Sequence, residues 1–261
     1  MAGDAYDTLA GVYDWLVPDA LLTPEGSVAA FESVVAELAP GASVLDCAAG
    51  TGQLAVGLAL RGFAVAASDA SGEMIARTRR LARERAVQVE VRACAWEQLA
   101  AQGLGGFDAV FCIGNSLTHA AGRAARRAAL TAMTSVLRDG GLLVVTSRNW
   151  ELVRRAGSRL DVAEELVERE GREALVVHAW TIPADPGEPH YLDVAVAVLG
   201  ERGSVTTHRE RLRCWPFTHQ ELDEDLRAAG LAPTASTYAD DVGRYLVTAT
   251  RLRPDPGLDP G

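Results

Sequence analysis

Asp46-Cys47-Ala48-Ala49-Gly50-Thr51-Gly52 is the stretch that decides how this chain folds. It follows a short apolar segment, 43–45, and opens a predicted amphipathic helix, 53–60. A second apolar segment, 64–68, then ends in Asp69. The glycines allow backbone N–H groups to approach a ligand closely, and a carboxylate after the second strand accepts hydrogen bonds from two ribose hydroxyls. The order of strand, turn, helix and strand therefore predicts a unit that binds a nucleoside.

The spacing of the small residues separates this turn from the turn of dinucleotide-binding proteins. Those proteins have the pattern G-x-G-x-x-G, whereas the small residues here are Ala48, Gly50 and Gly52, with Asp46 ahead of them. This spacing resembles the first motif of S-adenosylmethionine-dependent methyltransferases with a Rossmann-like fold. A tight strand-to-helix turn without a ligand is the alternative, but the position of Asp69 favours the ligand.

The composition argues against nucleic acids, membranes and metals as partners. The chain has 261 residues, a formal net charge of −10 and no lysine. Phosphate binding relies on clustered cations, so this acidic balance disfavours nucleic acid, and the basic run 77–85 is expected to be the solvated face of a helix. No apolar stretch approaches the ~20 residues of a membrane span. Metal-ligand spacing is missing among the histidines of the C-terminal half, which are His178, His190, His208 and His219.

The cysteines and the N-terminus predict a cytoplasmic protein. None of the cysteines forms a C-x-x-C pair, and their wide spacing predicts reduced, buried thiols. They are Cys47, Cys94, Cys112 and Cys214. The first residues are acidic, where a targeting segment would be basic.

An alternation of predicted strands and helices from residue 43 to residue 147 indicates a parallel α/β sheet. We expect strands at 43–46, 64–68, 87–92, 108–113 and 141–147, and helices at 53–61, 72–84, 97–102 and 123–137. The first part of the chain, 1–40, is predicted to be helical and to lie over the active site. Residues 41–253 are predicted to form the methyltransferase domain, and 254–261 to be a disordered tail.

The pattern changes after Trp150. An antiparallel meander of about three strands is predicted, then a helix and two last strands. The expected segments are 172–182, 190–199, 204–215, 219–229, 233–238 and 244–251, with a capping box at Thr218 and Glu221. The fold class is therefore α/β, a Rossmann-like methyltransferase sheet with an antiparallel β insertion, 158–216, between the fifth strand and the last helix. Ligands bind at the carboxyl ends of parallel strands, so we expect the insertion to be a lid. A decorative or dimerising insertion is the alternative.

Two further motifs make the resemblance to one group of methyltransferases more specific. Segment 113–119, Ile-Gly-Asn-Ser-Leu-Thr-His, closes the fourth strand, and segment 146–150, Thr-Ser-Arg-Asn-Trp, closes the fifth. Together with 46–52, 68–71 and Ala95-Trp96, they resemble the motif set of the glycine N-methyltransferase family. The resemblance covers residues 42–155 well and the insertion loosely. It implies S-adenosylmethionine as the cofactor.

The resemblance also implies roles for single residues. Asp69 is expected to hold the ribose hydroxyls, and the backbone of Ala49 and Gly50 to contact the methionine part. Trp96 and Ala95 would lie at the adenine, and Ile113 and His119 would flank the cofactor. The other expected cofactor contacts are Tyr13, Asp46, Ala48, Gly52, Ala70, Met74 and Gly114. For Tyr13, as for Tyr6 and Trp15, ordinary helix packing is the alternative.

Asn115 and Arg148 are the expected catalytic residues, because the resemblance implies that Asn115 holds the substrate and Arg148 pairs with its carboxylate. A guanidinium matches a carboxylate bidentately. At the end of a buried strand it is costly without an anionic partner. A structural salt bridge of Arg148 and a helix cap by Asn115 are the alternatives. For His119 a structural role or a cofactor contact is favoured over a general base, because methyl transfer to a neutral amine needs no strong base.

The chain departs from the family in its expected pocket. Ala95 stands where the glycine enzymes have asparagine, and no arginine occurs within 23–31 to hold the cofactor's carboxylate. An aromatic position of the family is Val194, and a pocket tyrosine is missing near 214–216. We therefore expect methyl transfer to the nitrogen of a small amine or amino acid, glycine-like or larger, and a homo-oligomer stays open. O- or C-methyl transfer to a specialised metabolite and cofactor binding without catalysis are the alternatives.

Overall fold

The turn at 46–52 joins β1 (Ser43–Asp46) to α4 (Gln53–Leu60) in the computed structural model, which describes residues 2–253. The main sheet has seven strands in the order β11-β12-β5-β4-β1-β2-β3. The other six are β2 (Ala64–Asp69), β3 (Val89–Ala93), β4 (Phe107–Cys112), β5 (Leu137–Arg148), β11 (Leu231–Ser236) and β12 (Arg244–Arg251). Strands β1 to β5 pair in parallel, and β12 runs antiparallel to β5. The carboxyl ends of β1, β2, β4 and β5 therefore lie at one edge of the sheet, together with the start of β12.

Helices cover the main sheet, and the sheet separates two hydrophobic cores. They are α1 (Ala2–Leu9), α2 (Pro24–Ala29), α3 (Glu32–Val35), α4, α5 (Gly72–Glu84), α6 (Gly122–Val136), α7 (Trp150–Ala156) and α8 (His219–Ala228). One core includes side chains of α2, α3, α4 and α5, and the other includes side chains of α6 and α8. The prediction that α4 is amphipathic was wrong, because residues 54–58 are all buried. Helix α2 packs on it so closely that a Cβ on Gly57 would lie 2.3 Å from the Pro24 carbonyl oxygen.

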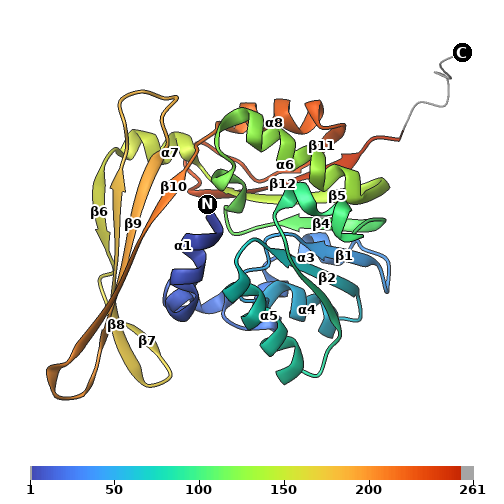
Figure 1. The fold of residues 1–261 in the computed structure, drawn as a ribbon. Helices are drawn as coiled ribbons and strands as arrows, with labels where there is room; N and C mark the ends of the chain where they lie inside the picture. Colours follow the sequence, from blue (N-terminus) through green and yellow to red (C-terminus); the bar gives the residue numbers. More distant parts are fainter. Residues whose placement is uncertain (1, 254–261) are drawn as a thin grey trace, which may run out of the picture.

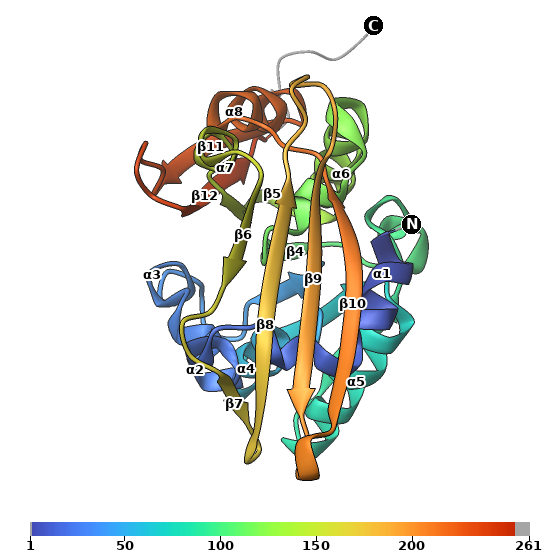
Figure 2. The same ribbon diagram turned by 90° about the vertical axis from the view of Figure 1, so that its left-hand side faces the viewer.

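A second, antiparallel sheet stands beside the main sheet, and α1 lies between the two (Figures 1 and 2). Its strands are β6 (Arg159–Val162), β7 (Val167–Arg169), β8 (Arg172–Thr181), β9 (His190–Leu199) and β10 (Val205–Cys214). The order is β10-β9-β8-β6, and β7 pairs with β8. The insertion is thus confirmed as antiparallel β structure, but it has five strands where about three were expected. Strands β6 and β7 have only 4 and 3 residues, so any alternation of polar and apolar residues in them is too short to mark a strand in a sequence.

Several element boundaries differ from those expected. Strand β5 begins at Leu137, four residues earlier than expected; residues 138–140, which follow it, are exposed and include Arg138 and Asp139, so they lack the apolar character expected of a buried strand. The helix expected at 97–102 is a pair of short 3₁₀ helices, Trp96–Gln98 and Ala100–Gln102. Helix α7 was not expected, and the Asn149 side chain caps it by accepting a hydrogen bond from the Leu152 N–H at 3.1 Å. The predicted capping box of Thr218 and Glu221 is confirmed. The tail predicted at 254–261 lies outside the described residues.

Candidate active site

The turn at 46–52 has the backbone that its glycines predict. Gly50 and Gly52 both have positive φ, 53° and 90°, which is the region that glycine adopts without steric cost. A Cβ on Gly52 would lie 2.8 Å from the Thr78 side chain, so α5 leaves no room for a larger residue. A Cβ on Gly50 would meet only the Tyr13 ring, at 4.0 Å. The backbone of Gly50 therefore faces a space that is bounded on one side by Tyr13.

The carboxylate of Asp69 is joined to this turn. It accepts hydrogen bonds from the backbone N–H groups of Gly50 and Ser71, both at 2.9 Å. Burial raises the pKa of Asp69, and these two hydrogen bonds partly offset the rise. Asp46 is 1% exposed beneath the turn, where burial raises its pKa to about 7. Asp69 is thus the carboxylate that borders the space in front of Gly50.

The other expected cofactor contacts are distributed around the same turn. The indole Nε1 of Trp96 donates a hydrogen bond to the Cys47 carbonyl at 2.8 Å, and Ala95 precedes it, partly buried. Gly114 N–H donates to the Thr146 hydroxyl at 2.9 Å. Ala70 is exposed, Ala48 and Ile113 are partly buried, and Ala49 and Met74 are buried.

Tyr6 and Tyr13 connect the N-terminal segment to both halves of the site. Their rings meet edge to face at 6.2 Å between centroids. Burial raises the pKa of Tyr6 well above its usual value, and the charge of Asp69 raises it further while that of Arg148 lowers it. The charges of Asp69, which is expected to bind the ribose, and of Arg148, which is expected to bind the substrate, therefore both act on Tyr6. The same segment is tied to α5 by an ion pair of Arg77 with Asp14.

His119 is held between two partners. Its Nε2 lies 2.9 Å from the Tyr6 hydroxyl and its Nδ1 lies 3.2 Å from the Arg213 carbonyl oxygen. A carbonyl only accepts, so Nδ1 carries the hydrogen and Nε2 accepts from the Tyr6 hydroxyl. Burial lowers the pKa of His119. Both nitrogens are in use, which agrees with a structural role or a cofactor contact and leaves no free nitrogen for a base.

Replacing Tyr6 by phenylalanine should lower the free energy of unfolding by about 1–3 kcal/mol, because the buried Nε2 of His119 would lose its donor. Urea denaturation measures the difference. Tyr191→Phe is the matched control, because the Tyr191 hydroxyl makes no hydrogen bond with residues 2–253. Equal stability of the two variants would contradict the role given to the Tyr6 hydroxyl.

Asn115 joins the ends of β4 and β5. Its backbone is left-handed, with φ 69°, a conformation that asparagine tolerates better than most residues. Its Oδ1 accepts a hydrogen bond from the Arg148 backbone N–H at 2.9 Å, and the side chain makes no cap for the helix that follows. The structure thus brings together the two residues that were expected to hold the substrate.

The guanidinium of Arg148 has no acidic partner. Within residues 2–253 it forms no ion pair or hydrogen bond, and it lies over the ring of Trp180 at 5.3 Å. Burial, and then the charge of Arg244, lower its pKa to about 10, so the group remains cationic at neutral pH. The salt bridge that was the structural alternative for Arg148 does not form. A half-buried cation without a partner is a feature that an anionic ligand would stabilise.

Three residues at this site were missed by sequence reasoning. Trp180 and His178 belong to β8, and Arg244 begins β12 opposite Arg148. Nothing in the local sequence marks them, because they reach the site only through the pairing of distant strands. The continuous apolar run 174–177 in β8 was the available signal, and it indicates a strand without showing which face carries site residues.

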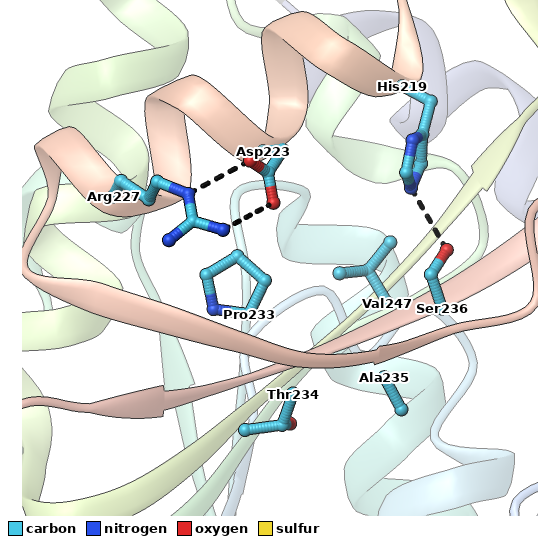
Figure 3. A pocket seen from close by; sticks show the side chains of 8 residues that line it. All are labelled: His219, Asp223, Arg227, Pro233, Thr234, Ala235, Ser236 and Val247. Carbon is cyan, nitrogen blue, oxygen red and sulfur yellow. Dashed lines mark hydrogen bonds and ion pairs between the residues drawn. The ribbon is translucent and has the colours of Figure 1, made fainter.

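A separate cavity of about 250 Å³ lies between α8 and β11 (Figure 3). Its lining includes His219, whose Nε2 lies 3.0 Å from the Ser236 hydroxyl, and the ion pair of Asp223 with Arg227. None of the expected site residues lines it. The described part of the chain contains no group of three or more acidic, histidine or cysteine side chains that could hold a metal ion. None of its helices is long and apolar enough to cross a membrane.

Known proteins resemble this chain in sequence. The family described as "Methyltransferase domain" matches residues 44–141. The glycine/sarcosine N-methyltransferase of Parasynechococcus marenigrum is 40% identical over 116 residues, which cover 44% of this chain and only 41% of that protein. Human glycine N-methyltransferase is 30% identical over 206 residues, which cover 71% of this chain and 68% of that protein.

Solved structures resemble it over more of its length. The CcbJ methyltransferase from Streptomyces caelestis superimposes with a TM-score of 0.76 and 25% identity, covering 97% of this chain and 100% of that one. The sugar N-methyltransferase KedS8 from Streptoalloteichus has a TM-score of 0.68 and 26% identity, covering 85% of each chain.

Proposed function

Because this chain belongs to the glycine N-methyltransferase family of S-adenosylmethionine-dependent methyltransferases, we propose that it transfers a methyl group to the nitrogen of a small amine that carries a carboxylate. The observation that carries the acceptor class is the guanidinium of Arg148, half-buried on Trp180 and without an acid within residues 2–253. The relatives from Parasynechococcus marenigrum, human and Streptoalloteichus are themselves N-methyltransferases, which supports nitrogen as the acceptor atom.

The cofactor half of the site fits S-adenosylmethionine. The open backbone face of Gly50 and the carboxylate of Asp69 would hold the methionine and ribose parts, and Trp96 would lie at the adenine. When bound, S-adenosylmethionine supplies an electrophilic methyl group on a sulfonium, so the protein needs no covalent nucleophile. The residues around Gly50 would then position the methyl donor, because catalysis of such a transfer depends on holding donor and acceptor in line.

The acceptor half would orient the amine. Arg148 would hold the carboxylate by two parallel N–H donors, and Asn115 fixes the backbone from which that guanidinium extends. The Nδ2 of Asn115 makes no hydrogen bond within residues 2–253, so it is available to the substrate. The unprotonated form of the amine is the nucleophile: its lone pair would form the new C–N bond as the methyl group leaves the sulfonium sulfur, and the resulting ammonium would lose a proton to water.

The N-terminal helices and the second sheet would close over this site and exclude water. Tyr6 of α1 supports this proposal, because its hydroxyl lies 2.9 Å from His119 Nε2 and its ring meets the ring of Tyr13. The four cysteines are free and buried, which supports a reducing compartment and hence the cytoplasm. A homo-oligomer remains a prediction.

An amine is favoured over a hydroxyl as acceptor. A hydroxyl usually needs a base to become nucleophilic, and His119 was the residue expected to offer one. Its two nitrogens are occupied by Tyr6 and Arg213.

Replacing Arg148 by alanine should raise the KM for a carboxylated amine about 100-fold, because a bidentate charge-assisted pair is lost. The KM for an uncharged amine should change little. Steady-state assays that read product mass across a panel of amines measure both values. Arg148→Lys is the matched variant, and it should recover part of the loss because it keeps the charge without the fork of donors. Equal losses for charged and uncharged amines would remove Arg148 from carboxylate binding.

A further inference from the structure

A second arginine stands directly opposite Arg148. In the antiparallel pair of β5 and β12, Arg244 is the register partner of Arg148. Directly opposed residues share a face of the sheet, and like charges in this relation destabilise it. Neither arginine forms an ion pair or a side-chain hydrogen bond with any residue in the described range, 2–253. Arg148 is partly buried at the end of β5, and Arg244 is exposed at the start of β12.

The neighbouring charges do not compensate this pair. Arg159 lies over the same Trp180 ring at 5.5 Å, but Asp161 neutralises it at 3.0 Å. His178 is the register partner of Asp161. Burial and the charge of Arg148 lower the pKa of His178, so it is mainly neutral at pH 7. Two positive charges therefore remain at the end of β5, in a chain whose net charge is −10.

Strand order places the arginine pair on the acceptor side. Strand β12 is separated from β1 by β5 and β4, and three strand spacings of roughly 4.8 Å amount to about 14 Å. Arg148 is nearer to the turn at 46–52 than Arg244 by one strand. Arg244 thus lies at the same edge of the sheet as the turn at 46–52, three strands away from it.

We propose that the methyl acceptor is a dianion that bridges Arg148 and Arg244, either an amine with two carboxylates or an amine with one phosphate. This inference rests on the proposed function at Arg148 and adds a second contact to it. Arg244 would be a specificity residue, which selects doubly charged amines over amines with one carboxylate. Trp180 and the Arg159–Asp161 pair would form the wall beside the bound dianion.

Calorimetry on protein saturated with S-adenosylhomocysteine tests this without relying on turnover. The probes are alanine with one carboxylate, aspartate and glutamate with two, and phosphoethanolamine with one phosphate. In the wild type at least one dianion should bind about 10-fold or more tightly than alanine. Arg244→Gln should abolish that preference and leave the affinity for alanine within about twofold. The preferred dianion distinguishes the carboxylate from the phosphate.

Arg209→Gln is the matched control, because Arg209 is exposed on β10 and Arg211 remains to pair with Asp193. It should leave every affinity unchanged. The proposal is overturned if alanine binds the wild type as well as the dianions do. The proposal is also overturned if Arg244→Gln weakens the binding of S-adenosylhomocysteine itself, because that result would assign Arg244 to the carboxylate of the cofactor. Failure of the proposed function is a separate result, since it would appear as absent methyl transfer with the affinity ratios intact.

Discussion

Replacing Asp69 by alanine should weaken the binding of S-adenosylmethionine by about 100-fold or more, with the fold retained. Two effects add. The ribose hydroxyls would lose a charged acceptor, and hydrogen bonds to charged groups contribute about 1.5–3 kcal/mol each. The turn would also lose its anchor, because Asp69 accepts the N–H groups of Gly50 and Ser71. Calorimetric titration with the cofactor and its demethylated product measures the loss.

Asp69→Asn separates the two effects. The amide keeps one oxygen that accepts from the backbone but removes the charge, so its loss should be intermediate. Glu90→Ala is the matched control, because this exposed acid lies on the neighbouring β3 and, among the described residues, forms an ion pair only with Arg92. If Asp69→Ala bound S-adenosylmethionine about as tightly as Glu90→Ala does, the assignment of Asp69 to the ribose hydroxyls would be contradicted.

Replacing Asp225 by alanine should lower the free energy of unfolding by about 3–5 kcal/mol. Asp225 is fully buried on α8 and pairs with Arg123, Arg126 and Arg127. Arg126 is itself 2% exposed, with its guanidinium over the Phe217 ring at 4.7 Å. Removing the carboxylate leaves a buried cation uncompensated, which is the costly way to break such a pair. Urea denaturation with linear extrapolation measures the change.

Asp223→Ala provides the control on the same helix, because its ion pair with Arg227 is exposed. We expect it to cost no more than about 0.5 kcal/mol. Replacing Asp225 and Arg126 together by apolar residues should recover most of the loss. A loss below about 1 kcal/mol for Asp225→Ala would show that this network contributes little.

The pH dependence of the Asp225 contribution has a defined sign. Burial alone would raise the pKa of Asp225, but hydrogen bonds from the three arginines outweigh it and hold the pKa below its usual value. The contribution is therefore complete above the ordinary pKa of an aspartate, about 4, and is lost as the pH falls through the lowered value. The wild type and Asp225→Ala should converge in stability at strongly acidic pH.

The parts of the fold that follow from local pattern could be predicted from the sequence. Glycines at 50 and 52 need positive φ, and Asp69 ends a strand parallel to β1, so the cofactor half of the site was recognisable from one turn. The capping box at Thr218 and Glu221 is equally local. These features depend on neighbours in the chain, and the sequence displays those neighbours directly.

The acceptor half depends on contacts between distant segments. Arg244 meets Arg148 because β12 pairs with β5 in one register, and Trp180 meets Arg148 because a second sheet stands over the first. His119 was visible as a residue, but its Tyr6 partner lies 113 positions away. A single sequence fixes neither the register nor the orientation of the insertion, so the environment of the substrate residues had to come from the structure.

The bond from Asn115 to the main chain of Arg148 has an evolutionary consequence. Because the side chain of Asn115, in the segment that follows β4, binds this backbone, the side chain at position 148 can be exchanged without releasing the end of β5. Relatives that methylate uncharged molecules would then need few substitutions to retarget the same scaffold. The side chain at position 148 alone would then set the class of acceptor, while Asn115 continues to hold the backbone of that position.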